Sequence, residues 1–198
     1  MSSLLDKNKI ISTKDRLLEA AEIEFALGGF DGAKLADIAK RVGIRRPSLL
    51  YHFPSKAELY KTTVERAFEQ LGAALDSGMS AAGSFRDRLQ SITEVFADFL
   101  ERRPFLARLV IREFLTGQGP GHDILLSEVA PLLDSVESFI AGEGGELVRS
   151  SLPIRAAIMQ SVSNILLKNA SGGLQEALWG SDDHSWTLTR FVFFEKEV

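Results

Sequence analysis

The sequence predicts an all-α protein, with an N-terminal three-helix head that contains a helix-turn-helix, a long connecting helix and a helical body. Three observations support this fold class. Apolar residues recur at helical spacing, capping residues and Gly or Pro mark segment ends, and two short helical patterns flank Gly43. We therefore divide the chain into a head, residues 1–60, and a body, residues 61–198.

The head is expected to begin with a helix at Ser12, because the Ser-x-x-Asp spacing to Asp15 is a capping box. This helix should end near Gly28-Gly29, a left-handed stop. The next helix has a short apolar stripe, consisting of Leu35, Ile38, Ala39 and Val42. Gly43 then supplies the positive φ that a tight turn between two helices requires.

The second helix of the pair begins around Pro47, which suits a first helical turn because its missing N–H would be unpaired there anyway. A further capping box, Ser55 with Glu58, predicts the connecting helix from Lys56 to about residue 77. Its N-terminal N–H groups and Lys56 together predict a phosphate site.

The body is expected to contain four or five further helices, separated by glycine and proline. Their predicted ranges are 85–103, 104–116, 123–141, 153–170 and 185–196. Pro131 predicts a kink or a late helix start in the third range. The helix from Pro153 is apolar on more than one side, which indicates a central position or a subunit interface. The last range has strand propensity, and helix is favoured there because its setting is helical.

Charge is unevenly distributed along the chain. The net charge of −4 divides into +2 for residues 1–60 and −6 for the remainder. No acidic residue lies between Ala39 and Ala57, so the basic groups of the head form a local patch of the kind that binds phosphates.

Several classes of protein are disfavoured by the composition. The chain has no cysteine, which excludes disulfides and fits a reducing compartment. Nothing resembles a signal peptide, and no apolar run approaches the ~18–20 residues of a membrane span, so we expect a cytoplasmic protein with no membrane partner. The three histidines lack ligand spacing, and no nucleotide or nucleophile motif is present. We expect no metal, no cofactor, no catalytic residues and no enzyme activity.

The N-terminal end of the second helix of a helix-turn-helix faces base edges in the DNA major groove. Here that end carries Arg45, Arg46 and Ser48. Arginine can pair bidentately with guanine, which contributes roughly 1–3 kcal/mol of discrimination per pair. The alternative is that Arg45 and Arg46 are simply a solvated basic pair.

A set of spaced residues within 13–60 carries a family resemblance. They are Leu17-Leu18-x-Ala20-Ala21, Phe25, Gly29-Phe30, Asp37-Ile38-Ala39, Val42-Gly43-Ile44, Ser48-Leu49, Tyr51-His52-Phe53 and Lys56-x-x-Leu59. In this pattern the head resembles the N-terminal domain of the TetR family of bacterial transcriptional regulators. The resemblance implies a body that binds a small-molecule effector, and a homodimer formed by the last two helices as a four-helix bundle. It also implies a palindromic double-stranded DNA operator.

The resemblance and the local chemistry give one set of predicted DNA-binding residues: Lys34, Arg45, Arg46, Pro47, Ser48, Tyr51, His52 and Lys56. Four positions depart from the family pattern. Lys34 stands where a Ser or Thr cap is usual, Arg45 where a small or polar residue is usual, Pro47 where Gly is frequent, and Leu50 where Tyr is common. Tyr51 is therefore expected to make the phosphate contact alone, unless it packs against Phe53, and sequence preference does not transfer.

Candidate effector contacts in the body are aromatic or polar residues within apolar runs: Phe96, Phe99, Arg112, Phe114, Met159 and Asn164. The alternative is ordinary core for the phenylalanines, and surface ladders or interface hydrogen bonds for the polar residues.

The favoured function is a ligand-responsive repressor. Two alternatives stay open: an activator or ligand-independent regulator with the same head, and a helical small-molecule-binding or scaffold protein that has lost its affinity for DNA.

Overall fold

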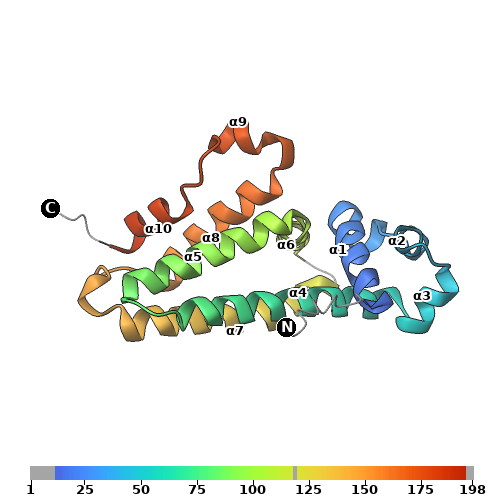
Figure 1. The fold of residues 1–198 in the computed structure, drawn as a ribbon, viewed down its shortest axis with the longest axis horizontal. Helices are drawn as coiled ribbons and strands as arrows, with labels where there is room; N and C mark the ends of the chain where they lie inside the picture. The colour runs from blue at the N-terminus through green and yellow to red at the C-terminus, as the bar shows by residue number, and fades with distance from the viewer. Residues whose placement is uncertain (1–11, 118–119, 195–198) are drawn as a thin grey trace, which may run out of the picture.

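The structure is a computed structural model and describes residues 12–117 and 120–194. The regular secondary structure of the described residues is helical, apart from one isolated antiparallel bridge between Val148 and Phe194. Figure 1 shows an elongated molecule with the three helices of the head at one end and the body at the other. The all-α prediction is confirmed. None of the helices in the described ranges is long and apolar enough to cross a membrane.

The head consists of α1 (Thr13–Gly32), α2 (Leu35–Val42) and α3 (Arg46–His52). Ser12 caps α1 as predicted, because its Oγ accepts a hydrogen bond from the Asp15 N–H at 3.1 Å. Gly29 has a left-handed φ of 69° and interrupts α1, but a further turn follows to Gly32. The predicted stop at Gly28-Gly29 is therefore a break within the helix and not its end.

Gly43 turns the chain between α2 and α3. It has a φ of 77°, and the N–H of Ile44 after it donates to the Ala39 carbonyl at 3.0 Å. Ala39 and Leu49 are buried where the two helices meet, and Pro47 lies in the first turn of α3. The predicted helix-turn-helix is thus formed at the expected residues.

The long helix α4 (Lys56–Met79) connects the head to the body. Ser55 caps it, because its Oγ accepts from the Glu58 N–H at 3.1 Å. Its buried residues follow helical spacing and pack against α1, α5 and α7. One helix therefore belongs to the cores of both parts of the molecule.

Within the described residues the body adds six α-helices, and all of them except the short helix 175–179 contribute buried residues to its apolar core. They are α5 (Phe85–Arg102), α6 (Pro104–Thr116), α7 (Pro120–Glu143), α8 (Ile154–Ala170), α9 (Gln175–Trp179) and α10 (Ser185–Phe193). Short 3-10 turns cover Gly145–Leu147 and Gly172–Leu174. Helix α6 packs against α1 and α8, so it lies between the head and the rest of the body.

Helix α7 differs from the prediction. It begins at Pro120 and continues through Pro131, so of the two alternatives predicted there, a kink or a late helix start, the late start is wrong. The helix buries Leu125 before the proline, and Val136 and Ile140 after it. Packing of both halves against neighbouring helices offsets the hydrogen bond that proline cannot make.

The C-terminal part contains one helix that the sequence did not reveal, α9. The last segment is helical, as favoured, but α10 ends at Phe193. Phe194 is extended and pairs with Val148, and the other described residues with strand propensity in this stretch lie in the helix. The predicted end at residue 196 lies outside the described residues.

Two glycines of α7 give a test of this packing. A Cβ on Gly121 would overlap the Glu113 carboxylate and the Tyr60 hydroxyl, whereas a Cβ on Gly142 would meet nothing within 4 Å. We expect Gly121→Ala to lower the free energy of unfolding by about 1–3 kcal/mol through overpacking. Gly142→Ala should raise it by up to about 1 kcal/mol through helix propensity. Urea unfolding measures both, and equal stability of the two variants would contradict the close approach at Gly121.

Candidate functional site

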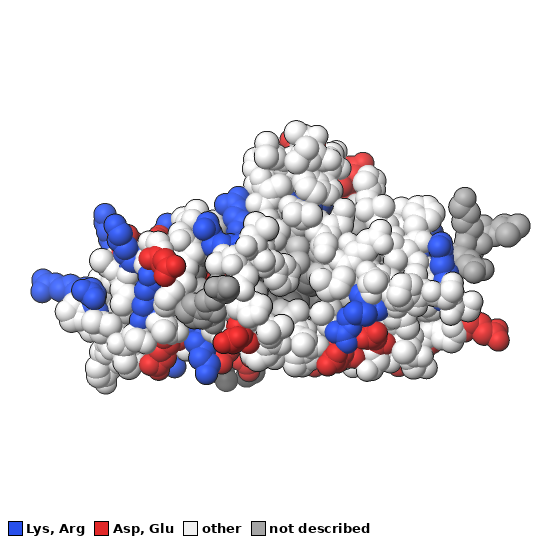
Figure 2. Space-filling model, turned by 180° about the vertical axis from the view of Figure 1, so that it is seen from behind, with Lys and Arg blue, Asp and Glu red and all other residues white. Residues whose placement is uncertain are grey.

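The N-terminal end of α3 is an exposed basic surface. Arg45 is the N-cap residue, Arg46, Pro47 and Ser48 form the first turn, and all four are exposed. In the described ranges neither arginine side chain takes part in a hydrogen bond or ion pair. Figure 2 shows Lys and Arg side chains projecting from this end of the molecule, at the left of that view. The arginine charges are therefore available to an external partner.

Tyr51 and His52 lie at the other end of α3. Tyr51 is 87% exposed, and its ring meets the His52 ring edge-on, with centroids 5.5 Å apart. Phe53 is buried, so Tyr51 is not packed into the core beside it. Its hydroxyl can reach a partner beyond the head.

A shallow groove runs where α2, α3 and α4 begin, and three basic residues line it: Lys34, Arg46 and Lys56. Lys34 is the N-cap residue of α2, and its side chain does not close the helix end. The N-termini of α2 and α4 both lie in this region, and helix N-termini attract anions. The groove thus combines three cationic groups with two helix ends.

Lys56 also has a structural role. Its Nζ donates to the Asp31 carbonyl at 2.9 Å and lies 5.0 Å from the centre of the Phe30 ring. These contacts hold the start of α4 against the end of α1. Arg41, by comparison, pairs with Glu24 at 2.6 Å and stabilises the packing of α2 on α1.

The head and the body meet at a buried hydrogen bond. The Tyr60 hydroxyl of α4 donates to Glu113 Oε1 of α6 at 2.5 Å, and both residues are buried. Burial, and then the bond to Glu113, raise the pKa of Tyr60 well above its usual range. The Tyr60 ring also meets Phe25 and Phe30 of α1 edge-on. We call Tyr60, Glu113 and these two rings the joint.

Arg112, the neighbour of Glu113 on α6, contacts the head on the other side. Its guanidinium donates to the Leu27 carbonyl of α1 at 2.9 Å, beside the break at Gly29. Arg112 was a candidate effector contact, and the structure places it in the head–body contact. Through these two residues, α6 is bonded to both α1 and α4.

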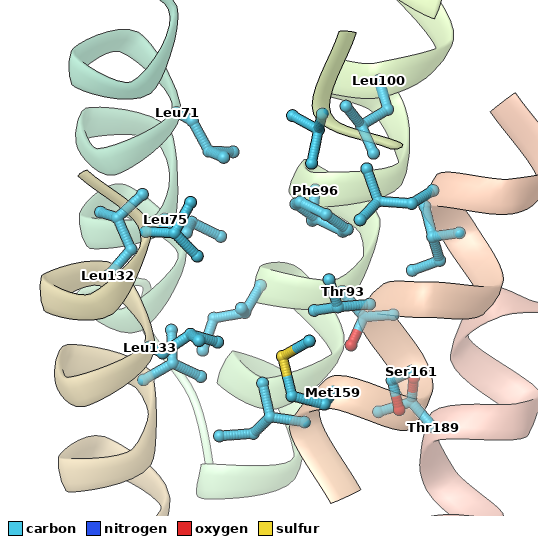
Figure 3. Close-up of a pocket in the computed structure, with 18 of the residues that line it drawn as sticks. Leu71, Leu75, Thr93, Phe96, Leu100, Leu132, Leu133, Met159, Ser161 and Thr189 are labelled. Carbon is cyan, nitrogen blue, oxygen red and sulfur yellow. The ribbon is translucent and has the colours of Figure 1, made fainter. Parts of the chain in front are cut away.

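A cavity of about 120 Å³ lies inside the body, enclosed by α4, α5, α6, α7, α8 and α10. Its lining is almost entirely aliphatic and aromatic, as Figure 3 shows. Three of the candidate effector contacts line it: Phe96, Phe114 and Met159. Two do not, because Phe99 lies in a surface groove beneath Arg103 and Asn164 is on α8 away from the lining.

Sequence reasoning missed the cavity's hydroxyl groups, which belong to Thr93, Ser161 and Thr189. Small hydroxyl residues within apolar helical runs were the available signal, but the pattern does not show which face of a helix is enclosed. Across the described ranges, no group of three His, Cys, Asp or Glu side chains could hold a metal ion.

The fold and the surface at α3 define a class: an all-helical protein with an N-terminal DNA-binding helix-turn-helix domain. Residues 17–63 match the family model described as bacterial regulatory proteins, tetR family. The resemblance to the TetR family is confirmed, and this part of the chain is a TetR-type helix-turn-helix domain.

Two curated relatives match the N-terminal part of the chain. The HTH-type transcriptional activator FasR of Mycolicibacterium smegmatis is 34% identical over 88 residues, 44% of this chain and 40% of FasR. The negative transcriptional regulator IcaR of the Staphylococcus aureus biofilm operon icaADBC is 36% identical over 90 residues, 45% of this chain and 48% of IcaR. The chain thus spans less than half the length of these relatives.

Solved structures resemble nearly the whole chain in fold. The fatty acid degradation regulator FadR from Bacillus halodurans has a TM-score of 0.73 at 14% identity, covering 90% of this chain and 96% of that one. The ketosteroid regulator KstR2 of Mycobacterium tuberculosis has a TM-score of 0.72 at 17% identity, covering 95% and 98%. At these identities the likeness concerns the fold, and it extends to the helical body.

The joint gives a prediction of stability and of its pH dependence. Tyr60→Phe leaves the buried Glu113 without its donor and should lower the free energy of unfolding by about 1–3 kcal/mol at pH 7. The pKa of Tyr60 is raised in the folded state. The contribution of its protonated hydroxyl to the free energy of unfolding is therefore complete below the ordinary tyrosine pKa of about 10, and it is lost as pH rises further. The variant should therefore lose less stability than the natural protein between pH 9 and about 11.

Urea unfolding of the natural protein and of Tyr60→Phe at pH 9 and about pH 11 measures this difference in lost stability. Tyr51→Phe removes the same hydroxyl from an exposed ring and should change stability by less than about 0.5 kcal/mol. A Tyr60→Phe variant as stable as Tyr51→Phe would show that the joint does not depend on this bond.

Proposed function

We propose that the protein is a DNA-binding transcriptional regulator: a ligand-responsive repressor that binds a palindromic operator as a homodimer in the cytoplasm. The observation that carries the proposal is the pair of exposed, uncommitted arginines, Arg45 and Arg46, at the N-terminal end of α3 in a TetR-type domain. The alternative of a simple solvated pair does not explain why both arginines lie at the end of the helix that faces base edges in a helix-turn-helix.

On DNA, α3 enters the major groove, and Arg45 and Arg46 read base edges together with Ser48. Pro47 fixes the start of the helix. The phosphates are contacted by Lys34, Tyr51 and His52, and by Lys56 through the charge that it adds to the groove. Two such heads in a dimer would bind half-sites about 34–36 Å apart.

Exposed apolar side chains on α8 and α10 support the homodimer. Leu167 of α8 is 51% exposed, and Leu188 and Phe191 of α10 are 45% and 52% exposed. Helix α10 packs against α8, so these residues belong to neighbouring helices. Exposed large apolar side chains on neighbouring helices favour association, and a dimer formed there would remove them from water.

A contact between the cavity and the head supports the response to a ligand. Helix α6 lines the cavity with Leu106, Val110 and Phe114, and the same helix bonds to α4 and α1 through Glu113 and Arg112. A ligand that displaces α6 would shift α4 and change the separation of the two heads. The population of the DNA-competent state would then fall.

An activator is a second candidate, because FasR is named as one and matches the same part of the chain. The head would serve either sign of regulation. A ligand-independent regulator would need no cavity, and a scaffold without DNA affinity would need no exposed arginines on α3. These two features favour the ligand-responsive, DNA-binding proposal.

The test of DNA binding is selection of genomic fragments by the purified protein at about 150 mM salt, followed by titration of the enriched fragment at several salt concentrations. We expect one enriched palindrome and a log-log salt slope near −5, for roughly six neutralised phosphates. Arg45→Ala with Arg46→Ala should abolish the enrichment, because the base contacts are lost.

Arg102→Ala is the matched control for charge, since Arg102 is an exposed arginine on α5 in the body. Its fragment selection should equal that of the natural protein. Loss of enrichment in both variants, or enrichment that survives the double substitution, would reject α3 as the reading element.

The dimer gives a separate prediction. Leu188→Glu with Phe191→Glu places two charges on the proposed interface, and sedimentation should change from a dimer to a monomer. Leu126→Glu is the control, because Leu126 is 59% exposed on α7 and lies outside the interface. A double variant that stays dimeric would place the interface elsewhere.

A further inference from the structure

Two buried hydroxyl groups at the cavity have no hydrogen-bond partner. They are Ser161 Oγ of α8 and Thr189 Oγ1 of α10, and neither contacts a donor or acceptor in the part of the chain that the structure describes. Thr189 is only 3% exposed. Buried polar groups are normally paired, so each of these hydroxyls needs an explanation.

Other buried hydroxyls of the protein show what a purely structural role looks like. Thr63 Oγ1 donates to the Leu59 carbonyl at 2.7 Å, and Thr93 Oγ1 donates to the Leu89 carbonyl at 2.9 Å. Both bond to their own helix, four residues back. Ser161 and Thr189 do not, although each is also on a helix.

The unpaired hydroxyls belong to two helices that pack together, α8 and α10. Figure 3 shows Ser161 and Thr189 on the α8–α10 side of the cavity, and Thr93 on α5 lines the same cavity. Thr93 Oγ1 already donates its hydrogen but can still accept one. These three residues supply the hydroxyl groups of an otherwise apolar lining, and we call them the hydroxyl patch.

The lining contains no charged residue and no histidine. An ionised ligand group would lose its hydration there without a counter-charge, which is strongly unfavourable. The volume of about 120 Å³ is close to that of an engineered cavity of about 150 Å³ that binds benzene. Phe114 lines the cavity and is 50% exposed, so the cavity approaches the surface beside it.

We propose that this cavity binds a neutral, mostly hydrocarbon molecule that carries a single hydroxyl or carbonyl group, and that Ser161 and Thr189 bond to that group. The hydrocarbon part contacts the leucines and phenylalanines of α4, α5 and α7. The proposal names the chemical class of the effector, and only its regulatory consequence rests on the proposed function. Binding itself requires nothing of the DNA-binding head.

Three probes of similar size test the proposal by isothermal titration calorimetry with the full chain: benzyl alcohol, toluene and benzoate. Benzyl alcohol and toluene should bind, and benzoate should bind at least ~100-fold more weakly than benzyl alcohol because its carboxylate is charged. Ser161→Ala and Thr189→Val should each lower the affinity for benzyl alcohol by roughly 3- to 10-fold, which corresponds to the loss of one hydrogen bond. Toluene affinity should stay within about twofold in both variants.

Thr63→Val is the matched control. Thr63 is as buried as Thr189, but it is on α4 outside the cavity lining and has a partner. This variant should bind benzyl alcohol like the natural protein and unfold at a lower temperature. Thr189→Val without probe should unfold at an unchanged or higher temperature, because its hydroxyl has no partner to lose.

Four results would overturn the proposal: no binding of any probe, benzoate binding as tightly as benzyl alcohol, equal weakening of toluene and benzyl alcohol, or a lowered unfolding temperature for Thr189→Val. The last result would show that the hydroxyl is bonded within the folded protein. All measurements are made without DNA. Failure to select an operator would therefore reject the proposed regulator and leave the probe-binding result intact. Failure of the probes to bind would reject the proposed ligand class and leave the DNA-binding result intact.

Discussion

The arrangement of the molecule depends on the joint, where Tyr60 of α4 is buried against α1 and bonded to Glu113 of α6. Helix α3 is short and packs on α2, so its position depends on the helices that hold α2, which are α1 directly and α4 through α1. Both of these helices are held by α6, through Glu113 and Arg112. The small apolar cavity is thus connected to the exposed basic surface through packed helices, α6 first and then α1, α4 and α2.

Much of the fold could be predicted because the signals are local. The caps at Ser12 and Ser55 and the left-handed turn at Gly43 are each decided within a few residues. A hydroxyl three residues before a free N–H, or a glycine where φ must be positive, acts in the same way in any fold. The exposure of Arg45 and Arg46 follows similarly, because the apolar residues of α3 leave its first turn on the outside.

The remaining features depend on residues far apart in the sequence. Helix α7 passes through Pro131 because it is packed along both halves, and nothing near the proline indicates this. Periodicity showed that Phe96 and Phe99 are both on an apolar helix, but only the packing of α5 decides that Phe96 faces the cavity. The same limit applies to Arg112 and to the hydroxyl patch, because a hydroxyl without a partner is recognisable only once all its neighbours are known.

The contacts of Lys56 have an electrical consequence. Lys56 is bonded to a backbone carbonyl and to the face of a phenylalanine ring, and both of these are uncharged. A carboxylate partner would cancel the field of the ammonium group at a distance, whereas these partners leave a full positive charge fixed at the N-terminus of α4. Lys56 therefore contributes to the attraction of the head for a polyanion, although its side chain is held by contacts within the protein.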